Sequence, residues 1–84
     1  MSDEIREQIR RYILANYLVG EAPQNLKDDT PLMTGHLLDS MATLGLVAFI
    51  EKEYGIELEA HEVGVAHFDR IADIADLVAR KRGA

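Results

Sequence analysis

Apolar residues recur at helical spacing along much of this chain. From Asp3 to about Val19 they repeat every three or four residues, which predicts an amphipathic helix that ends within residues 20–23, where glycine and proline occur. A second helix is predicted from Ser40 to Tyr54, because this stretch is rich in apolar residues and is followed by Gly55. The apolar positions that predict the first helix are Ile5, Ile9, Tyr12, Ile13 and Tyr17.

A third long helix is predicted near the end of the chain. It begins near Asp69, the expected N-cap, and ends with the basic run Arg80-Lys81-Arg82 before Gly83. Its apolar residues follow the spacing i, i+3, i+4, i+7 at Ile71, Ile74, Ala75 and Val78.

The segments between these helices differ in length. Residues 23–39 form a long loop, which we expect to pack against the domain through its apolar residues. Ile56 and Leu58 alternate with acids in a stretch too short for a strand without a partner, so it is predicted as a connector. Residues 59–66 predict a short helix carrying Val63 and Ala66. The apolar anchors of the long loop are Leu26, Leu32, Met33, Leu37 and Leu38.

Together these elements predict an all-α fold. Residues 1–84 are expected to form a single domain, a small up-and-down four-helix bundle of three main helices plus a short third helix, with a long loop between helices 1 and 2. A chain of 84 residues has a core sufficient for marginal folding but little room for a deep active-site cleft.

The predicted helix from Ser40 to Tyr54 has two apolar stripes on nearly opposite sides. One contains Leu46, Val47, Ile50 and Tyr54, and is the better core face because it is larger. The other contains Met41, Leu44, Gly45 and Ala48. Either this helix is buried on all sides, or the second stripe is a surface on which a partner protein docks.

Composition excludes several classes of function. The net charge is −6, and the acids are concentrated in the middle of the chain, which disfavours nucleic-acid binding and favours either basic partner surfaces or simple solubility. No cysteine is present, so disulfides and thiolate chemistry from the chain itself are excluded. No apolar run is long enough for a membrane span and the polar start is not a signal peptide, so a cytoplasmic location without membrane contact is expected. The protein is also expected to be a monomer.

Ser40 is the main candidate for chemistry, and its position allows three interpretations. It could be a plain helix N-cap, or a catalytic nucleophile, which would need a base and an oxyanion hole. His36 lies nearby in sequence, but no nucleophile-elbow pattern surrounds the serine. The third interpretation is covalent attachment of a phosphate-linked group, since a helix N-terminus stabilises a phosphodiester.

No metal site is predicted. The three histidines, His36, His61 and His67, lack metal-ligand spacing and are expected at the surface or in loops. The pair Asp28-Asp29 lacks the twelve-residue calcium-loop pattern.

The segment Leu37-Leu38-Asp39-Ser40-Met41 strongly resembles the acyl and peptidyl carrier proteins, in which Asp-Ser-Leu or Asp-Ser-Met begins the second helix. The resemblance extends over nearly the whole chain, through Asp29-Thr30-Pro31-Leu32, the helix exit at residues 51–56 and the segment 68–74. In that family the serine is esterified with 4′-phosphopantetheine from coenzyme A, and the thiol of this arm carries an acyl or aminoacyl group as a thioester.

The resemblance implies a non-enzymatic carrier modified at Ser40 by a phosphopantetheinyl transferase. Asp39 matches the aspartate that helps the transferase to recognise the serine. The residues implied in recognition of the transferase or of partner enzymes are Leu38, Asp39, Met41, Leu44, Gly45 and Ala48.

This sequence departs from the carriers of bacterial fatty-acid synthesis, which place several acids along the second helix. Here the corresponding positions are Ala42, Gly45 and Lys52, with only Glu51 and Glu53 acidic. The implied role is a free-standing carrier of a specialised pathway, loaded by an adenylating acyl- or amino-acid ligase and serving downstream acyl-processing enzymes. The alternative is a small helical adaptor that docks a partner through its second helix without modification.

Overall fold

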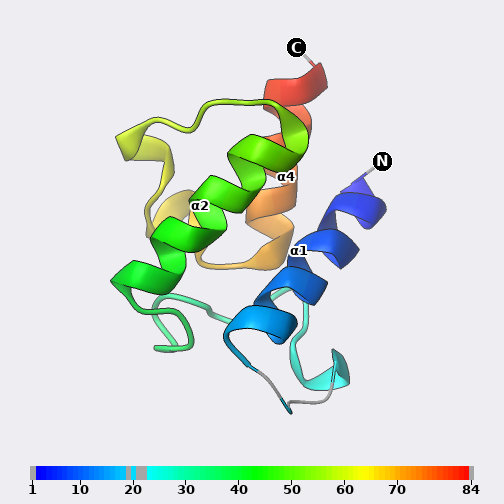
Figure 1. Cartoon of the computed structure of the whole chain (residues 1–84), viewed down its shortest axis with the longest axis vertical. Coiled ribbons are helices and arrows are strands. Elements are labelled where there is room, and N and C mark those ends of the chain that lie inside the picture. Colours follow the sequence, from blue (N-terminus) through cyan, green and yellow to red (C-terminus); the bar gives the residue numbers. More distant parts are fainter. Residues whose placement is uncertain (1, 19, 21–22, 84) are drawn as a thin grey trace.

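The computed structural model describes residues 2–18, 20 and 23–83, and it is mostly helical (Figure 1). The described residues contain four α-helices and no strand. Two short 3₁₀ helices, η1 and η2, occur in the connections. The elements in chain order are α1 (Ser2–Asn16), η1 (Pro23–Asn25), α2 (Ser40–Tyr54), η2 (Ala60–Glu62), α3 (Val65–Phe68) and α4 (Ile71–Gly83). The prediction of an all-α fold is therefore confirmed.

The three long helices surround one apolar core. α1 packs against α4 and α2 contacts both, while the short α3 lies against the start of α4. The core draws side chains from every α-helix and from the long loop, so the loop is packed down as expected. Its buried apolar residues are Ile5, Ile9, Ile13, Leu26, Leu32, Leu38, Ala42, Leu46, Ile50, Phe68, Ile71, Ile74, Ala75, Leu77 and Val78.

The first helix ends earlier than its apolar pattern predicted. α1 stops at Asn16, and the next N–H groups, those of Tyr17 and Leu18, both bond to the carbonyl of Ile13 at 2.9 and 3.1 Å. The Asn16 side chain donates to the Tyr12 carbonyl, a local bond that competes with continued helix. Val19, the predicted end, lies outside the described residues.

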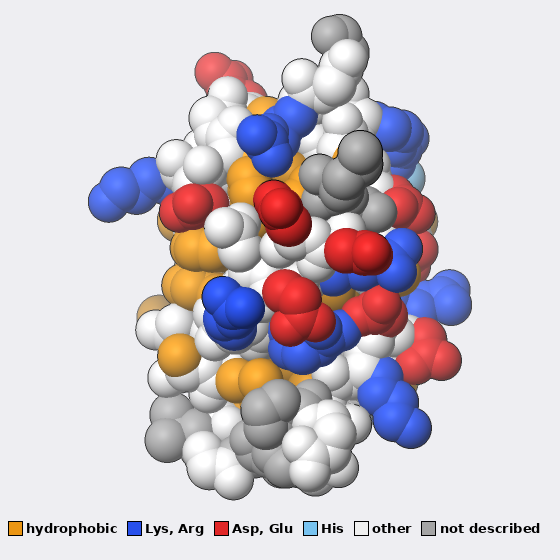
Figure 2. Space-filling model, turned by 90° about the vertical axis from the view of Figure 1, so that its right-hand side faces the viewer, with side chains coloured by type: hydrophobic (Ala, Val, Ile, Leu, Met, Phe, Trp, Pro, Cys, Tyr) orange, Lys and Arg blue, Asp and Glu red, His pale blue; other side chains and the backbone are white. Residues whose placement is uncertain are grey.

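A cluster of charges fastens the long loop to α1. Asp28 accepts from Arg6 and Arg10, and Arg10 also donates to the carbonyl of Leu26 at 2.8 Å. The Asp28 carbonyl accepts the Ala72 N–H at 3.1 Å, which joins the loop to α4. Figure 2 shows acidic and basic side chains interspersed over this side of the molecule. Asp28 therefore has structural partners within the chain.

The region between α2 and α4 corrects two predictions. The expected helix at residues 59–66 is two short pieces, η2 and α3, because Gly64 is extended and interrupts it. Asp69 is not the N-cap of the last helix, which begins two residues later at Ile71. Its carboxylate accepts hydrogen bonds from the long loop instead, because the tertiary fold brings Met33 and Thr34 against it.

No helix in the described ranges is both long enough and apolar enough to cross a bilayer.

Candidate functional site

The second helix begins where the sequence predicts, but its cap is Asp39. The Asp39 carboxylate accepts the Ala42 N–H at 2.8 Å, and its extended backbone carbonyl accepts the Thr43 N–H at 2.9 Å. Ser40 is therefore the first helical residue, and the interpretation of Ser40 as the cap is wrong. Because the cap bonds are made by Asp39, the exposed Ser40 hydroxyl has no hydrogen-bond partner among the described residues.

The loop that leads into Ser40 is held by its own backbone. The carbonyl of Leu32 accepts the N–H groups of both Leu37 and Leu38 at 3.0 Å, and the carbonyl of Met33 accepts from His36 at 3.1 Å. His36 has a φ of 61°, in the left-handed region that disfavours side chains with a Cβ. This strained residue lies in the tight loop only four positions before Ser40. The backbone strain is therefore located beside the candidate site.

Replacing His36 with glycine should stabilise the fold. We expect His36→Gly to raise the free energy of unfolding by about 0.5–1 kcal/mol, because glycine adopts positive φ without steric cost. The exposed imidazole makes no hydrogen bond or ion pair with the described residues that the substitution would remove. Denaturant unfolding of His36→Gly beside His36→Ala, which keeps the Cβ, measures this. Equal stabilisation by both variants would contradict the role assigned to backbone strain.

Two clefts open beside Asp39. One, of about 520 Å³, lies between the start of α2, the long loop and Val63. The other, of about 460 Å³, is bounded by Tyr17, the loop and Met41. The first cleft is lined mainly by apolar side chains, and Ser40 itself forms part of its wall. The lining residues are Met33, Leu38, Asp39, Ser40, Thr43, Leu44 and Val63. A group attached to Ser40 would have an apolar groove directly at its point of attachment.

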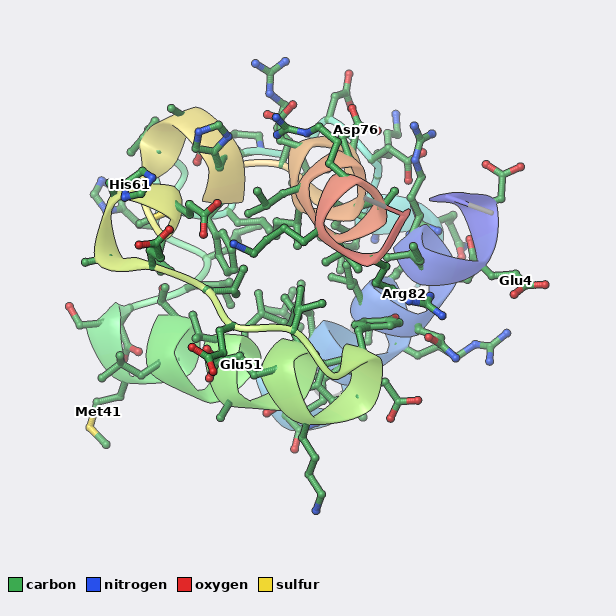
Figure 3. All side chains as sticks on the ribbon, turned by 90° about the horizontal axis from the view of Figure 1, so that it is seen from above. Glu4, Met41, Glu51, His61, Asp76 and Arg82 are labelled. Carbon is green, nitrogen blue, oxygen red and sulfur yellow. The ribbon has the colours of Figure 1, made fainter. Side chains whose placement is uncertain are left out.

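The second stripe of α2 is mostly a free surface. Met41 is 80% exposed and Leu44 is 67% exposed, and Ala48 is exposed as well. Met41 projects away from the rest of the molecule in Figure 3. Leu37 in the loop and Val65 in α3 are also exposed large apolar side chains. The interpretation that α2 is buried on all sides is therefore wrong.

Gly45 belongs to the interior and not to this surface. It is half-buried beneath Tyr17, and a Cβ placed on it would overlap the Tyr17 hydroxyl. The Tyr12 hydroxyl donates to the Gly45 carbonyl at 3.2 Å, and its oxygen lies 3.3 Å from the Tyr17 hydroxyl oxygen. Its hydrogen bond with Tyr12 raises the pKa of Tyr17 to about 12, so Tyr17 remains a neutral phenol. The small residue admits Tyr12 of α1 and the following Tyr17, rather than a partner protein, close to α2.

This packing predicts that Gly45→Ala has opposite effects on stability in the presence and in the absence of the Tyr17 hydroxyl. In the natural chain Gly45→Ala should destabilise the fold by about 1 kcal/mol, because the overlap with Tyr17 outweighs the better helix propensity of alanine. In the Tyr17→Phe background the same substitution should stabilise it, since the overlapping oxygen is gone. Chemical unfolding of the four variants measures the coupling. Additive effects would show that the two residues do not interact.

The tertiary structure determines the burial or the hydrogen bonds of three more residues on or next to α2. Leu38 is 5% exposed and anchors the loop in the core, so it does not present a surface to partners. Glu51, one of the two retained acids, accepts the Leu58 N–H at 2.9 Å, and Figure 3 shows it on the side of α2 that faces the connector. Thr43 was not singled out from the sequence, yet it is buried and donates its hydroxyl to the Asp39 carbonyl at 2.9 Å.

Within the described residues, no histidine side chain is hydrogen-bonded to Ser40. His36 and His61 are exposed, as expected, while His67 is half-buried. His61 has Glu59 and Glu62 within 4.8 Å of its ring, close enough to share an ion. Glu62 already accepts from the Glu59 N–H and from Lys81, contacts that lower the pKa of Glu62. Glu62 thus has a structural role in joining η2 to α4.

No protein-family model matches this chain. No curated protein matches it significantly. Among solved structures, one described as "Crystal structure of FAD-dependent dehydrogenase" contains a chain with 33% identity and a TM-score of 0.75. The match covers 83% of this chain and 97% of that chain, so the matched chain is the shorter of the two. This chain therefore belongs to the same family as the small chain of that structure.

Proposed function

We propose that this protein is a four-helix-bundle carrier protein that holds acyl or aminoacyl groups on a 4′-phosphopantetheine arm attached to Ser40. The observation that carries the proposal is the state of the Ser40 hydroxyl. It is exposed at the first turn of α2 and borders an apolar groove, and it has no hydrogen bond to any described residue, since Asp39 caps the helix. The sequence Asp39-Ser40-Met41 at this place resembles the modification site of carrier proteins.

The residues around Ser40 fit a phosphate-linked arm. In the first turn of α2, the N–H groups of Ser40 and Met41 have no acceptor in the described part of the chain, so they are available to phosphate oxygens. The apolar wall formed by Leu38, Leu44 and Val63 offers cover for the carbon chain of the arm. When bound, the arm supplies the thiol that this cysteine-free chain lacks, and that thiol carries the cargo as a thioester.

The attachment reaction needs only a reactive hydroxyl from this chain. The Ser40 oxygen forms a bond to the phosphorus that bears pantetheine in coenzyme A, and the bond from that phosphorus to the bridging oxygen of the pyrophosphate breaks. The nucleotide leaves with the electron pair as adenosine 3′,5′-bisphosphate, and the hydroxyl proton passes to a base of the transferase. The carrier therefore needs neither a base nor an oxyanion hole of its own, unlike a serine hydrolase.

The surface beside Ser40 supports partners with apolar contact regions. Met41 and Leu44 are exposed and uncharged, and Glu51 is turned toward the connector, so the surface lacks a row of acids for a basic partner. We propose a phosphopantetheinyl transferase, an adenylating acyl- or amino-acid ligase and downstream acyl-processing enzymes as partners. This surface favours a specialised pathway over the housekeeping synthesis of fatty acids.

The solved relative adds one candidate among the downstream enzymes. It is described as an FAD-dependent dehydrogenase, but the matched chain is even shorter than this one. The described residues here form no βα unit of the kind that commonly binds dinucleotides. We therefore propose an FAD-dependent dehydrogenase as a partner that acts on the carried group, and do not assign FAD to this chain.

The proposal is tested by incubating the purified protein with coenzyme A and a broad-specificity phosphopantetheinyl transferase, then measuring the intact mass. A gain of one phosphopantetheine group is expected, and an unchanged mass would refute the proposal. The second candidate, an unmodified adaptor, is favoured by the exposure of Met41 and Leu44. It predicts that partner binding is the same before and after Ser40→Ala.

A further inference from the structure

The loop before Ser40 is attached to a residue more than thirty positions away in sequence. Asp69 Oδ1 accepts the N–H groups of Met33 and Thr34, each at 2.8 Å, and Oδ2 accepts the Thr34 hydroxyl at 2.9 Å. The Asp69 carbonyl accepts the Leu32 N–H at 2.6 Å. One residue thus makes four hydrogen bonds to three consecutive residues of the loop.

Asp69 is itself rigidly placed. It follows Phe68 and precedes Ile71 by two positions, and both of these side chains are fully buried. Its backbone is helical, at the junction of α3 and α4. The hydrogen bond from the Thr34 N–H lowers the pKa of Asp69, so the carboxylate is ionised at neutral pH and its bonds are charge-assisted.

The hydrogen-bonded loop continues from these contacts to the modification site. Leu32, held by the Asp69 carbonyl, in turn accepts the N–H groups of Leu37 and Leu38. Leu38 directly precedes Asp39, whose carboxylate caps α2 in front of Ser40. Met33, held by the Asp69 carboxylate, lines the groove beside Ser40. Contacts at Asp69 therefore determine both the path of the chain into the helix cap and one wall of the groove.

We infer that Asp69 is a positioning residue for the modification of Ser40, an inference that rests on the proposed carrier function. It holds residues 32–34 so that the loop presents Ser40 and the adjacent groove in one arrangement to the transferase. The four hydrogen bonds of Asp69 reach residues 32–34 and not Ser40, so Asp69 acts through the loop. Displacement of a reacting group by about 1 Å can cost as much as a hundredfold in rate, so a loosened loop should affect transfer strongly.

The test compares three substitutions in the unmodified full chain, with coenzyme A and a transferase as the probe. Asp69→Ala removes all three side-chain bonds, and Asp69→Glu keeps the charge but displaces the acceptors by one methylene. Asp69→Asn keeps an oxygen for the Met33 and Thr34 N–H groups. We expect kcat/KM for transfer to fall about tenfold in Asp69→Ala and in Asp69→Glu, and to stay within about threefold of the natural chain in Asp69→Asn. Asp76→Ala, which removes an exposed acid from α4, should leave kcat/KM unchanged.

Amide hydrogen exchange separates positioning from general loss of stability. In Asp69→Ala the amides of Met33 and Thr34 should lose protection, while those in the middle of α1 and α4 keep it. If Asp69→Ala fails to fold, the difference in kcat/KM between Asp69→Glu and Asp69→Asn decides whether Asp69 is a positioning residue. Transfer at the natural rate by Asp69→Glu, or by a folded Asp69→Ala, would overturn the inference. A natural chain that gains no mass would instead refute the carrier function, so the two failures are distinguishable.

Discussion

Ser40→Ala should abolish the gain of a phosphopantetheine group, because the substitution removes the one atom to which the arm would be joined. Intact-mass measurement after incubation with coenzyme A and a transferase gives an all-or-none result. The fold should survive, since Asp39 and not Ser40 caps α2 and the Ser40 hydroxyl has no partner among the described residues. Alanine also has a higher helix propensity than serine, so the free energy of unfolding should not fall.

The chain offers a matched control, since its sequence contains only one other serine, Ser2. Ser2→Ala should be modified at the natural rate. A mass gain that persists in Ser40→Ala would place the attachment elsewhere and refute the proposal. A serine hydrolase would instead be labelled at Ser40 by a fluorophosphonate probe and would turn over an ester. Labelling of the natural chain would favour that class and contradict the carrier function.

Leu44→Asp should weaken loading of the modified carrier by its ligase about thirtyfold in kcat/KM. Leu44 is 67% exposed on the surface that also contains Met41 and borders the groove at Ser40. A truncation at the centre of an interface commonly costs about 2 kcal/mol, and an unpaired carboxylate in an apolar contact costs at least as much. That free energy corresponds to roughly a thirtyfold change. The measurement is steady-state loading of the modified chain with radiolabelled substrate.

Two controls make this result specific to the surface near Ser40. Ala15→Asp adds the same charge at an exposed position of α1 and should load at the natural rate. Helicity and the unfolding midpoint of Leu44→Asp should match those of the natural chain, because the Leu44 side chain is not part of the core. Equal loading of Leu44→Asp and the natural chain would show that partners bind elsewhere.

Helix α2 was predictable from the sequence because both of its ends are local. Asp39 caps the helix through a bond three residues ahead, and Gly55 ends it with a φ of 65° that glycine accepts readily. The exposed stripe of Met41, Leu44 and Ala48 follows from helical periodicity together with the existence of a larger apolar stripe opposite. The assignment of Ser40 as the candidate site required nothing beyond this local pattern and the resemblance to carrier proteins.

Other assignments depended on contacts that no local pattern reveals. Asp69 has the residue type and the position of an N-cap, but its carboxylate bonds to a loop about 35 residues earlier. The sequence suggested that Gly45 leaves space for a partner protein, but the side chain of Tyr17, which directly follows α1, occupies that space. Leu37 and Leu38 are adjacent and chemically identical, yet only Leu38 is buried, because the loop turns its side chain into the core.

The sequence by itself determined the all-α class, the bounds of α2 and the place of Ser40 at its start. These features rest on interactions between residues a few positions apart, whose geometry is set by the helix itself. Only the tertiary structure decided that Gly45 is covered, that Leu38 is buried and that Asp69 holds the loop. Those properties arise where separate segments meet, and the partner of a side chain across such a contact is chosen by the packing of the whole domain.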